Sequence, residues 1–395
     1  MTRDGATQGT LQVDGAGLRF RIDGPRRAPV LVLSNSLGTT LELWDAQVPR
    51  LSAFFQVLRY DHRGHGGSTA PRSPYEIADL GGDLLGLLDA LDVDQAAVCG
   101  ISLGGMVAMW LAAHHPARVA SIVVACSAPE LGPTTSWQDR AAGVRRDGLA
   151  PLLPNLLERW LTPEVRERRP DLVAGVARML ERCDAEGYAA CCEAIGEMDL
   201  RPVLGDIRAP SLVIGGAHDP VTPPATQLAL AERLAAGLLV LPASSHLANL
   251  SEPDAFTEAV LSHVAGSPAR RGATVRRAVL GEEHVARAAE PADSLSREFS
   301  DFITRYAWGE VWSRPGLDRR TRSAATLALL VASGRYDELS FHIAAARRNG
   351  LSAEEIREVV LHCAIYAGLP VVRGALPVVH EALERTRPAD GGAGS

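Results

Sequence analysis

A serine between two glycines is the strongest chemical signal in the sequence. It lies in the motif G-I-S-L-G at 100–104, directly after the apolar run 96–99 and before a helical segment that stops at Pro116. On a tight turn between a strand and a helix a serine is exposed for attack. The flanking glycines avoid collisions that a β-carbon would cause. This context predicts that Ser102 is a nucleophile and not part of an ordinary Gly/Ser turn.

Two later segments offer the base and the acid that a serine nucleophile needs. Asp219 follows the apolar run SLVI and His246 follows the run LLVLP, so both are expected on loops at the carboxyl ends of strands. His218 and His263 are competing bases, but His218 adjoins the proposed acid and His263 lies in a helical segment. We therefore predict a catalytic triad of Ser102, Asp219 and His246.

Two backbone N–H groups are expected to stabilise the oxyanion that forms when a serine attacks a carbonyl. One belongs to Leu103, the residue after the nucleophile. The other should come from the loop at 34–38, after the first core strand, and Leu37 is its candidate. Ser36 and Trp137 are predicted to contact the substrate.

Strands and helices alternate over the first 265 residues. Apolar, β-branched runs separated by helical segments predict a parallel sheet that helices cover on both faces. The expected strands are 30–33, 56–60, 96–99, 122–125, 212–214 and 238–241. Leu-rich amphipathic pieces over about 130–206 predict a helical cap above the strand ends, where open α/β sheets bind ligands.

The sequence changes character two-thirds of the way along the chain. The stretch 266–274 is small, polar and basic, which is typical of a linker. Helix patterns follow, so we expect an all-α domain over 275–389 and a flexible tail over 390–395. A capping box at 352–355 and a glycine at Gly368 predict the start and the end of one helix.

Ionisable side chains recur at helical spacing in this second part. Glu338 and His342 share one helix face, and His362 and Tyr366 share a face of the next helix. Apolar neighbours indicate that one side of His342 is buried, so His342 and Glu338 are the candidates for proton transfer. His362, Tyr366 and Arg322 are candidates for binding substrate. The alternative is that all these residues form solvated helix pairs.

Composition excludes several classes of partner. Lys plus Arg is 40 and Asp plus Glu is 47, and the formal net charge is −7, so nucleic acid is not an expected partner. No segment is typical of a signal peptide or a membrane span, and we expect a cytoplasmic protein. The six cysteines lack metal-binding spacing and no glycine-rich phosphate loop follows a strand, so we expect no metal and no cofactor.

The first 265 residues resemble the 3-oxoadipate enol-lactonase family of α/β-hydrolases. The run LVLSNSLGTTLELWDAQVPRL is similar to that family's opening, and YDHRGHGGS is similar to its next signature loop. The order Ser, Asp, His is that of the α/β-hydrolases. The resemblance implies an α/β-hydrolase fold, a mostly parallel sheet with a helical cap, that opens an enol-lactone. It also marks Asp61, Arg63 and His65 as architecture beside the pocket.

From residue 273 the chain resembles the 4-carboxymuconolactone decarboxylase family, which implies an all-α, AhpD-like domain with His342 at its active site. Superfamily members that reduce peroxides carry C-x-x-C just before the matching histidine. This chain has R-Y-D-E at 335–338, so thiol chemistry is not expected. Arg140, Arg159 and Arg322 are candidates for holding substrate carboxylates.

The two resemblances imply consecutive steps of protocatechuate breakdown in the β-ketoadipate pathway. The helical domain would make the enol-lactone that the hydrolase domain opens, and the substrates are small lactones bearing carboxylates. A homo-oligomer through residues 275–385 is also expected, because so small a unit cannot cover its own apolar surface. Two alternatives stay open: an esterase with a non-catalytic, oligomerising helical domain, and a ligand-binding protein of hydrolase fold.

Overall fold

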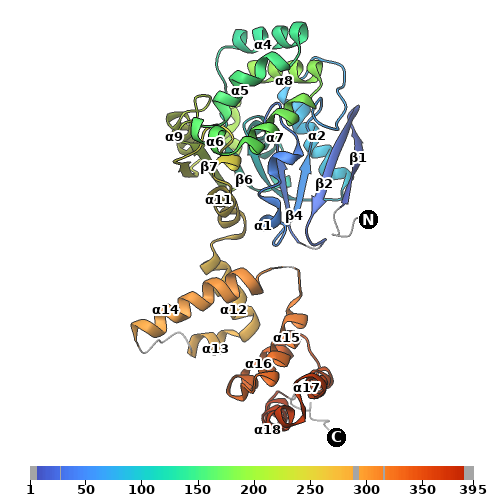
Figure 1. The fold of residues 1–395 in the computed structure, drawn as a ribbon, viewed down its shortest axis with the longest axis vertical. Coiled ribbons are helices and arrows are strands. Elements are labelled where there is room, and N and C mark those ends of the chain that lie inside the picture. Colours follow the sequence, from blue (N-terminus) through green and yellow to red (C-terminus); the bar gives the residue numbers. More distant parts are fainter. Residues whose placement is uncertain (1–6, 27, 288–292, 315, 387–395) are drawn as a thin grey trace. The chain divides into compact units, whose positions relative to one another are not determined.

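The chain forms two units in the computed structural model, Met1–Ala265 and Gly266–Ser395 (Figure 1). The structure describes residues 7–26, 28–287, 293–314 and 316–386. The expected tail at 390–395 lies outside these residues, as does the very end of the expected helical domain.

The sheet of the first unit has the strand order β1-β2-β4-β3-β5-β6-β7-β8. Its strands are β1 (Thr7–Val13), β2 (Ala16–Asp23), β3 (Val30–Ser34), β4 (Gln56–Tyr60), β5 (Ala96–Ile101), β6 (Val119–Ala125), β7 (Ser211–Gly216) and β8 (Gly237–Leu241). From β4 across to β8 all neighbours pair in parallel, whereas β1–β2 and β2–β4 pair antiparallel. The predicted mostly parallel sheet is confirmed, with two antiparallel strands, β1 and β2, added at one side.

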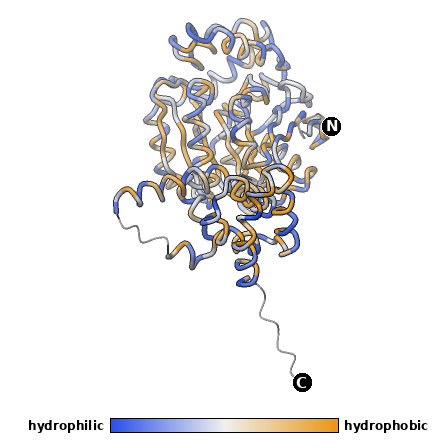
Figure 2. Tube along the Cα trace, turned by 60° about the horizontal axis from the view of Figure 1, so that its bottom comes forward, coloured by the Kyte–Doolittle hydropathy of each residue, from blue (hydrophilic) through white to orange (hydrophobic). Residues whose placement is uncertain are grey.

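Helices of the first unit pack against this sheet and cap it. Those outside the cap are η1 (Leu41–Trp44), α1 (Val48–Leu51), α2 (Ile77–Ala90), α3 (Leu103–His114), η2 (Pro116–Arg118), α9 (Pro224–Arg233), α10 (Ala248–Ser251) and α11 (Pro253–Ala265). Helix α3 is buried along most of its length against β5 and β6. Most other helices alternate hydrophilic and hydrophobic stretches (Figure 2), as expected of helices with one buried face.

The cap lies between β6 and β7, within the range predicted for it (Figure 1, green). It comprises α4 (Thr134–Asp147), η3 (Ala150–Leu152), α5 (Leu153–Trp160), α6 (Pro163–Arg168), α7 (Pro170–Glu181), α8 (Ala185–Glu197) and η4 (Arg201–Asp206). Two hydrogen bonds tie α5 to the loop after β8. Leu247 N donates to the Trp160 carbonyl over 3.0 Å, and Ser245 Oγ donates to the Arg159 carbonyl over 2.7 Å. The cap therefore touches the same loop that carries His246.

The second unit is helical throughout its described residues, as predicted. Its elements are α12 (Pro268–Leu280), α13 (Glu282–Arg287), α14 (Ser294–Ile303), the π-helical segment η5 (Thr304–Trp312), α15 (Arg319–Ala332), α16 (Tyr336–Arg348), α17 (Ala353–Ala367) and α18 (Leu369–Arg385). Its main core is formed by α15 to α18 around Leu327, Leu339 and Ile356. The capping box at Ser352 is confirmed, and α17 ends before Gly368.

The prediction of a linker at 266–274 is wrong, because α12 occupies most of that stretch. Arg271 is buried and pairs with Glu310 over 3.1 Å. A β-carbon at Gly272 would lie 1.8 Å from the Thr304 carbonyl oxygen, so α12 packs closely against η5. The small residues that resemble a linker in composition are what permit this close approach.

Candidate active sites

Ser102 lies on the turn that joins β5 to α3. Its backbone has φ 54° and ψ −117°, a conformation that residues other than glycine rarely adopt. Such a conformation costs about 1–3 kcal/mol and persists only where surrounding bonds hold it. Here Ser102 N donates to the Ala125 carbonyl over 2.8 Å, and the Ser102 carbonyl accepts from Ser127 Oγ over 2.7 Å. The turn is thus fixed on both sides of the serine.

The glycines on either side of Ser102 are required by close backbone contacts. A β-carbon at Gly100 would lie 2.0 Å from the Gly104 carbonyl oxygen. A β-carbon at Gly104 would lie 2.1 Å from the Ser34 carbonyl oxygen. Backbone atoms cannot retreat as a flexible side chain can, so the turn excludes any larger residue at both positions.

The three predicted triad residues form one hydrogen-bonded row. Ser102 Oγ lies 2.9 Å from His246 Nε2, and His246 Nδ1 lies 2.9 Å from Asp219 Oδ2. All three side chains are buried. Of the competing histidines, His218 is exposed, and His263 contacts the backbone carbonyl of Pro210 and not Ser102. The arrangement suits proton transfer from Ser102 to His246, with Asp219 fixing the ring.

Asp219 is held by its own turn. Its carboxylate accepts hydrogen bonds from Thr222 Oγ1 over 2.6 Å and from Val221 N over 2.8 Å. Burial alone would raise the pKa of Asp219, but His246 and these hydrogen bonds outweigh it and leave the pKa below its ordinary value. Asp219 therefore stays a carboxylate. Sequence reasoning missed Thr222, although the turn-forming Asp-Pro that precedes it was a usable signal.

The loop expected to form the oxyanion hole lines the same pocket as Ser102, through Ser36 and Leu37. Its next residue is held by a histidine, because Gly38 N donates to His65 Nε2 over 3.0 Å. His65 Nδ1 lies 3.0 Å from the Arg63 carbonyl, which the ring donates to. Burial lowers the pKa of His65 to about 4, so the ring stays neutral and keeps Nε2 as an acceptor. The roles of Leu37 and Leu103 as oxyanion donors stay predictions.

Asp61 and Arg63 have structural contacts near this loop. Asp61 accepts from Leu41 N over 2.7 Å and pairs with Arg19 over 3.1 Å. Arg63 pairs with Asp83 over 2.7 Å. Their groups are occupied by these partners, as expected of architecture beside a pocket.

A small pocket between the cap and the sheet opens onto Ser102 and His246. Its lining residues are Ser36, Leu37, Ser102, Leu131, Trp137, Arg140, Leu156, Arg159, Trp160, Tyr188, Ile195, Val221 and His246. The cap thus supplies most of the wall opposite the triad. Ser36 and Trp137 both line this pocket, and their contact with the substrate stays a prediction.

Two arginines of the cap bring positive charge to this pocket. The Arg140 guanidinium lies 5.4 Å from the centre of the Trp137 ring. Burial, and then the charge of Arg140, lower the pKa of Arg159 below its ordinary value. Within the described residues neither arginine forms an ion pair with a carboxylate. Both are therefore free to bind an anionic ligand.

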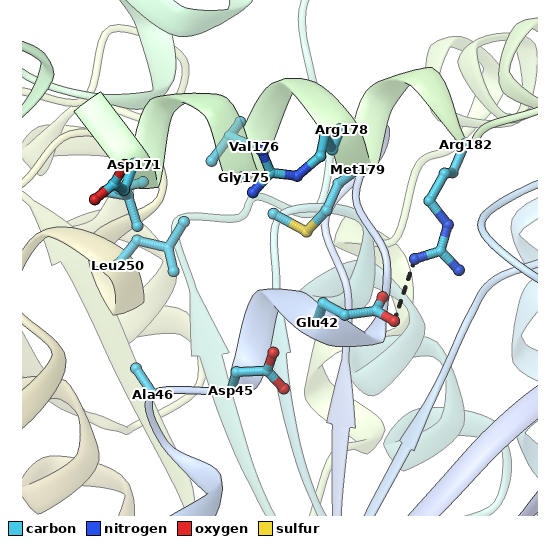
Figure 3. Close-up of a pocket in the computed structure, with 11 residues that line it drawn as sticks. Glu42, Asp45, Ala46, Asp171, Gly175, Val176, Arg178, Met179, Arg182 and Leu250 are labelled. Atoms are coloured by element: carbon cyan, nitrogen blue, oxygen red, sulfur yellow. Dashed lines mark ion pairs between the residues drawn. The ribbon is translucent and has the colours of Figure 1, made fainter. Parts of the chain in front are cut away.

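A second cavity, of about 430 Å³, lies between η1 and the cap helix α7 (Figure 3). Charged side chains line it, and Arg182 pairs with Glu42 across it over 3.2 Å. No residue of the Ser102 triad contributes to its lining. Its lining shares no residue with that of the Ser102 pocket, so the two are separate.

In the second unit, His342 lies on α16 beside aromatic neighbours. Its ring centre is 4.2 Å from that of Phe341, which stacks on His284 of α13. Burial, and then the nearby His284, lower the pKa of His342 to about 4. The ring is therefore neutral near pH 7 in the free protein.

The structure does not join Glu338 to His342. Glu338 pairs with Arg335 over 3.0 Å, and no hydrogen bond links it to His342 in the described part of the chain. Arg322 donates to the carbonyls of Arg314 and Leu317 over 3.0 and 3.2 Å. The roles of Glu338 and Arg322 in the decarboxylase site stay predictions.

His362 and Tyr366 lie together on an exposed face of α17, with ring centres 4.9 Å apart. His362 lines an open cavity with small residues of α15, including Ala324 and Ala328. His342 does not contribute to that cavity. Within one unit, the candidate decarboxylase residues therefore fall into two groups.

Neither a metal cluster nor a membrane-spanning helix is found where the chain is described. No group of three or more His, Cys, Asp or Glu side chains is arranged to hold a metal ion there. No helix there combines the length and the apolar character needed to cross a membrane.

The fold and the Ser102 site are those of the α/β-hydrolase class, and the comparisons with known proteins agree. Residues 29–253 match the alpha/beta hydrolase fold family, and residues 297–381 match the carboxymuconolactone decarboxylase family. The chain belongs to both families, and the two resemblances seen in the sequence are confirmed.

Named relatives match each part of the chain separately. 3-Oxoadipate enol-lactonase 2 of Acinetobacter baylyi is 42% identical over 251 residues, which cover 64% of this chain and 94% of that protein. The 4-carboxymuconolactone decarboxylase of the same organism is 49% identical over 112 residues, 28% of this chain and 84% of that protein. A solved enol-lactonase from Burkholderia xenovorans LB400 superimposes with a TM-score of 0.64 at 42% identity, covering 65% of this chain and all of that one.

Proposed function

We propose that the chain is a bifunctional enzyme of aromatic-acid breakdown. Its second unit decarboxylates 4-carboxymuconolactone to 3-oxoadipate enol-lactone, and its first unit hydrolyses that lactone to 3-oxoadipate. The observation that carries the proposal is the row Ser102–His246–Asp219 beneath a pocket with two unpaired arginines, in one chain with a domain of the decarboxylase family.

Hydrolysis begins when His246 accepts the Ser102 proton and Oγ attacks the lactone carbonyl carbon. The backbone N–H groups of Leu37 and Leu103 stabilise the oxyanion, and Asp219 stabilises the imidazolium. The ring C–O bond then breaks, His246 returns the proton to the leaving enol oxygen, and the enol becomes a ketone. Water, deprotonated by His246, releases the second carboxylate from Ser102.

Decarboxylation needs no external electron acceptor in this substrate. As the ring carboxylate leaves as carbon dioxide, its bonding electrons pass through the ring alkene to the lactone carbonyl and form a dienolate. A proton delivered to the ring carbon beside that carbonyl gives the enol-lactone. His342 is the proposed donor. It would take up its proton on binding, because the two carboxylates of this substrate raise the pKa of a nearby histidine.

We further propose that Arg140 and Arg159 recognise the carboxylate of the enol-lactone. Replacing Arg140 with glutamine should raise KM for the enol-lactone by roughly 10–100-fold, because it removes a charge-assisted hydrogen bond, while KM for a neutral ester stays within about twofold. Steady-state kinetics on both substrates measure this. Arg146→Gln is the matched control, since Arg146 is on the same helix but pairs with Asp147. An equal rise for both substrates would contradict the proposal.

The second unit is also the proposed site of homo-oligomerisation. Of the large apolar side chains that are exposed in the described residues, most belong to this unit. They include Leu361, Ile365 and Tyr366 of α17 and Leu369 at the start of α18, each at least 62% exposed. Exposed apolar surface of this extent on a small unit is typical of a subunit interface.

Replacing Ile365 with aspartate should therefore lower the mass of the full-length protein in solution. Multi-angle light scattering at micromolar concentration should give a multiple of 42.0 kDa for the wild type and a smaller mass for the variant. Leu228→Asp, which changes a half-exposed leucine of the first unit, should leave the mass unchanged. A monomeric wild-type chain would contradict the proposed assembly.

Supplying each lactone separately to the full-length protein tests the two activities. We expect carbon dioxide from 4-carboxymuconolactone and 3-oxoadipate from the enol-lactone, each over many turnovers. Hydrolysis without release of carbon dioxide would instead support an esterase with a non-catalytic helical unit. No more than one product molecule per chain would support a ligand-binding protein.

A further inference from the structure

Tyr188, on cap helix α8, is fully buried beside the loop that carries Leu37. A β-carbon built on Gly38 of that loop would lie 3.1 Å from Tyr188 Cε2. The Tyr188 ring centre also lies 6.3 Å from that of His65. The ring is therefore fixed by packing between the cap and the oxyanion loop.

The hydroxyl of Tyr188 is left without a hydrogen-bond partner among the described residues. The residue lines the Ser102 pocket, and its side chain interacts electrostatically with both Arg140 and Arg159. Burial raises the pKa of Tyr188 well above its ordinary value although Arg140 opposes the shift, so the hydroxyl keeps its proton. An unpaired donor thus lies beside two unpaired guanidinium groups.

A buried hydroxyl that bonds to nothing destabilises a fold, and a phenylalanine would fill the same space without that cost. A ligand that accepts a hydrogen bond removes the penalty. The pocket wall includes Leu156, Trp160 and Ile195, whose side chains offer no hydrogen-bond acceptor. The acceptor for the Tyr188 hydroxyl therefore comes from the ligand, from the part that Arg140 and Arg159 attract.

We propose that the Tyr188 hydroxyl donates a hydrogen bond to the substrate carboxylate that Arg140 and Arg159 bind, and so sets the specificity of the first unit for acidic lactones. The inference rests on the proposed function only in that the substrate bears a carboxylate. Tyr188 is a positioning residue. It binds the carboxylate end of the substrate, and Ser102 attacks the carbonyl at the other end.

The test compares the wild type with Tyr188→Phe in the full-length chain. Adipate, a dicarboxylate with the carbon chain of the product, is titrated while the intrinsic tryptophan fluorescence is followed, to which Trp137 and Trp160 of the pocket contribute. We expect the Kd for adipate to rise roughly 10–100-fold in the variant, as for loss of one hydrogen bond to a charged group. The KM for the neutral ester 4-nitrophenyl acetate should stay within about twofold.

Thermal unfolding supplies a second readout, in which the variant is expected to gain stability although it loses affinity for adipate. Tyr188→Phe should raise the Tm of the first unit by about 2 °C or more, because an unsatisfied buried donor is removed. The matched control is Tyr75→Phe, because the Tyr75 ring is also buried but its hydroxyl donates to the Pro71 carbonyl over 2.6 Å. This control should lower the Tm and leave the Kd for adipate unchanged.

An unchanged Kd for adipate in Tyr188→Phe overturns the inference. An equal weakening toward adipate and toward the neutral ester also overturns it, since that pattern reports disturbed packing. Binding of adipate needs no turnover. A selective loss of adipate binding in a protein that does not hydrolyse the enol-lactone would therefore support the inference while rejecting the proposed reaction.

Discussion

Ser102→Ala is expected to reduce enol-lactone hydrolysis by about 10⁴-fold or more, because no other group can form the acyl intermediate. The row from Ser102 through His246 to Asp219 is buried and joined by two 2.9 Å contacts. Loss of the Ser102 hydroxyl therefore removes the nucleophile of this row. Decarboxylation of 4-carboxymuconolactone by the same variant should be unchanged. The variant should therefore release carbon dioxide and accumulate the enol-lactone.

Absorbance assays with each lactone measure both rates of the Ser102 variant. Ser262→Ala is a suitable control, because Ser262 lies on α11 and bonds to Glu258 of the same helix. It should behave as the wild type in both assays. Retention by Ser102→Ala of more than about a tenth of wild-type lactonase activity would remove Ser102 from the proposed role.

His342→Ala is expected to lower decarboxylation about a hundredfold or more, which is within the usual contribution of general acid–base catalysis. Hydrolysis of added enol-lactone should not change, since His342 belongs to the other unit. The rate of carbon dioxide release and the rate of enol-lactone loss are measured on the same preparation. His380→Ala, which changes an exposed histidine of the same unit, is the control and should retain both activities.

A His342→Ala protein that keeps its fold and mass but decarboxylates at close to the wild-type rate would contradict this assignment. His342 would then be a packed helix residue. His362 and Tyr366, which lie together on α17, would become the residues to replace next.

The features that sequence predicted well are those specified by neighbouring residues. The turn at Ser102 needs two glycines for reasons confined to a few residues of backbone, and the helix that starts after Ser352 is encoded by its own capping box. The core strands are buried in runs, and such runs stand out as apolar and β-branched. The order of strands and helices, and hence the fold class, followed from these local signals.

Strand β1 and helix α12 were missed because their local signals are weak. Strand β1 has mostly exposed side chains and includes Gly9, so its sequence lacks an apolar run. It gains its stability from pairing with β2. Helix α12 has the composition of a linker, and only its contacts with η5 and the Arg271–Glu310 pair make it part of the packed unit.

Contacts between distant segments explain what sequence missed at the sites. The low pKa of His342 depends on burial and on His284, which lies on another helix. The unpaired hydroxyl of Tyr188 indicates a ligand contact only because Arg140 and Arg159 of other cap helices lie near it. Spacing along the chain indicated residue types suited to the chemistry but not which of them the fold brings together.

The most direct test of the proposed two-step function is to supply the wild-type protein with 4-carboxymuconolactone alone and follow carbon dioxide and 3-oxoadipate together. The account predicts one molecule of each per lactone consumed, with the enol-lactone appearing only transiently. Substrate that stays unchanged, or enol-lactone that accumulates without 3-oxoadipate, would contradict it.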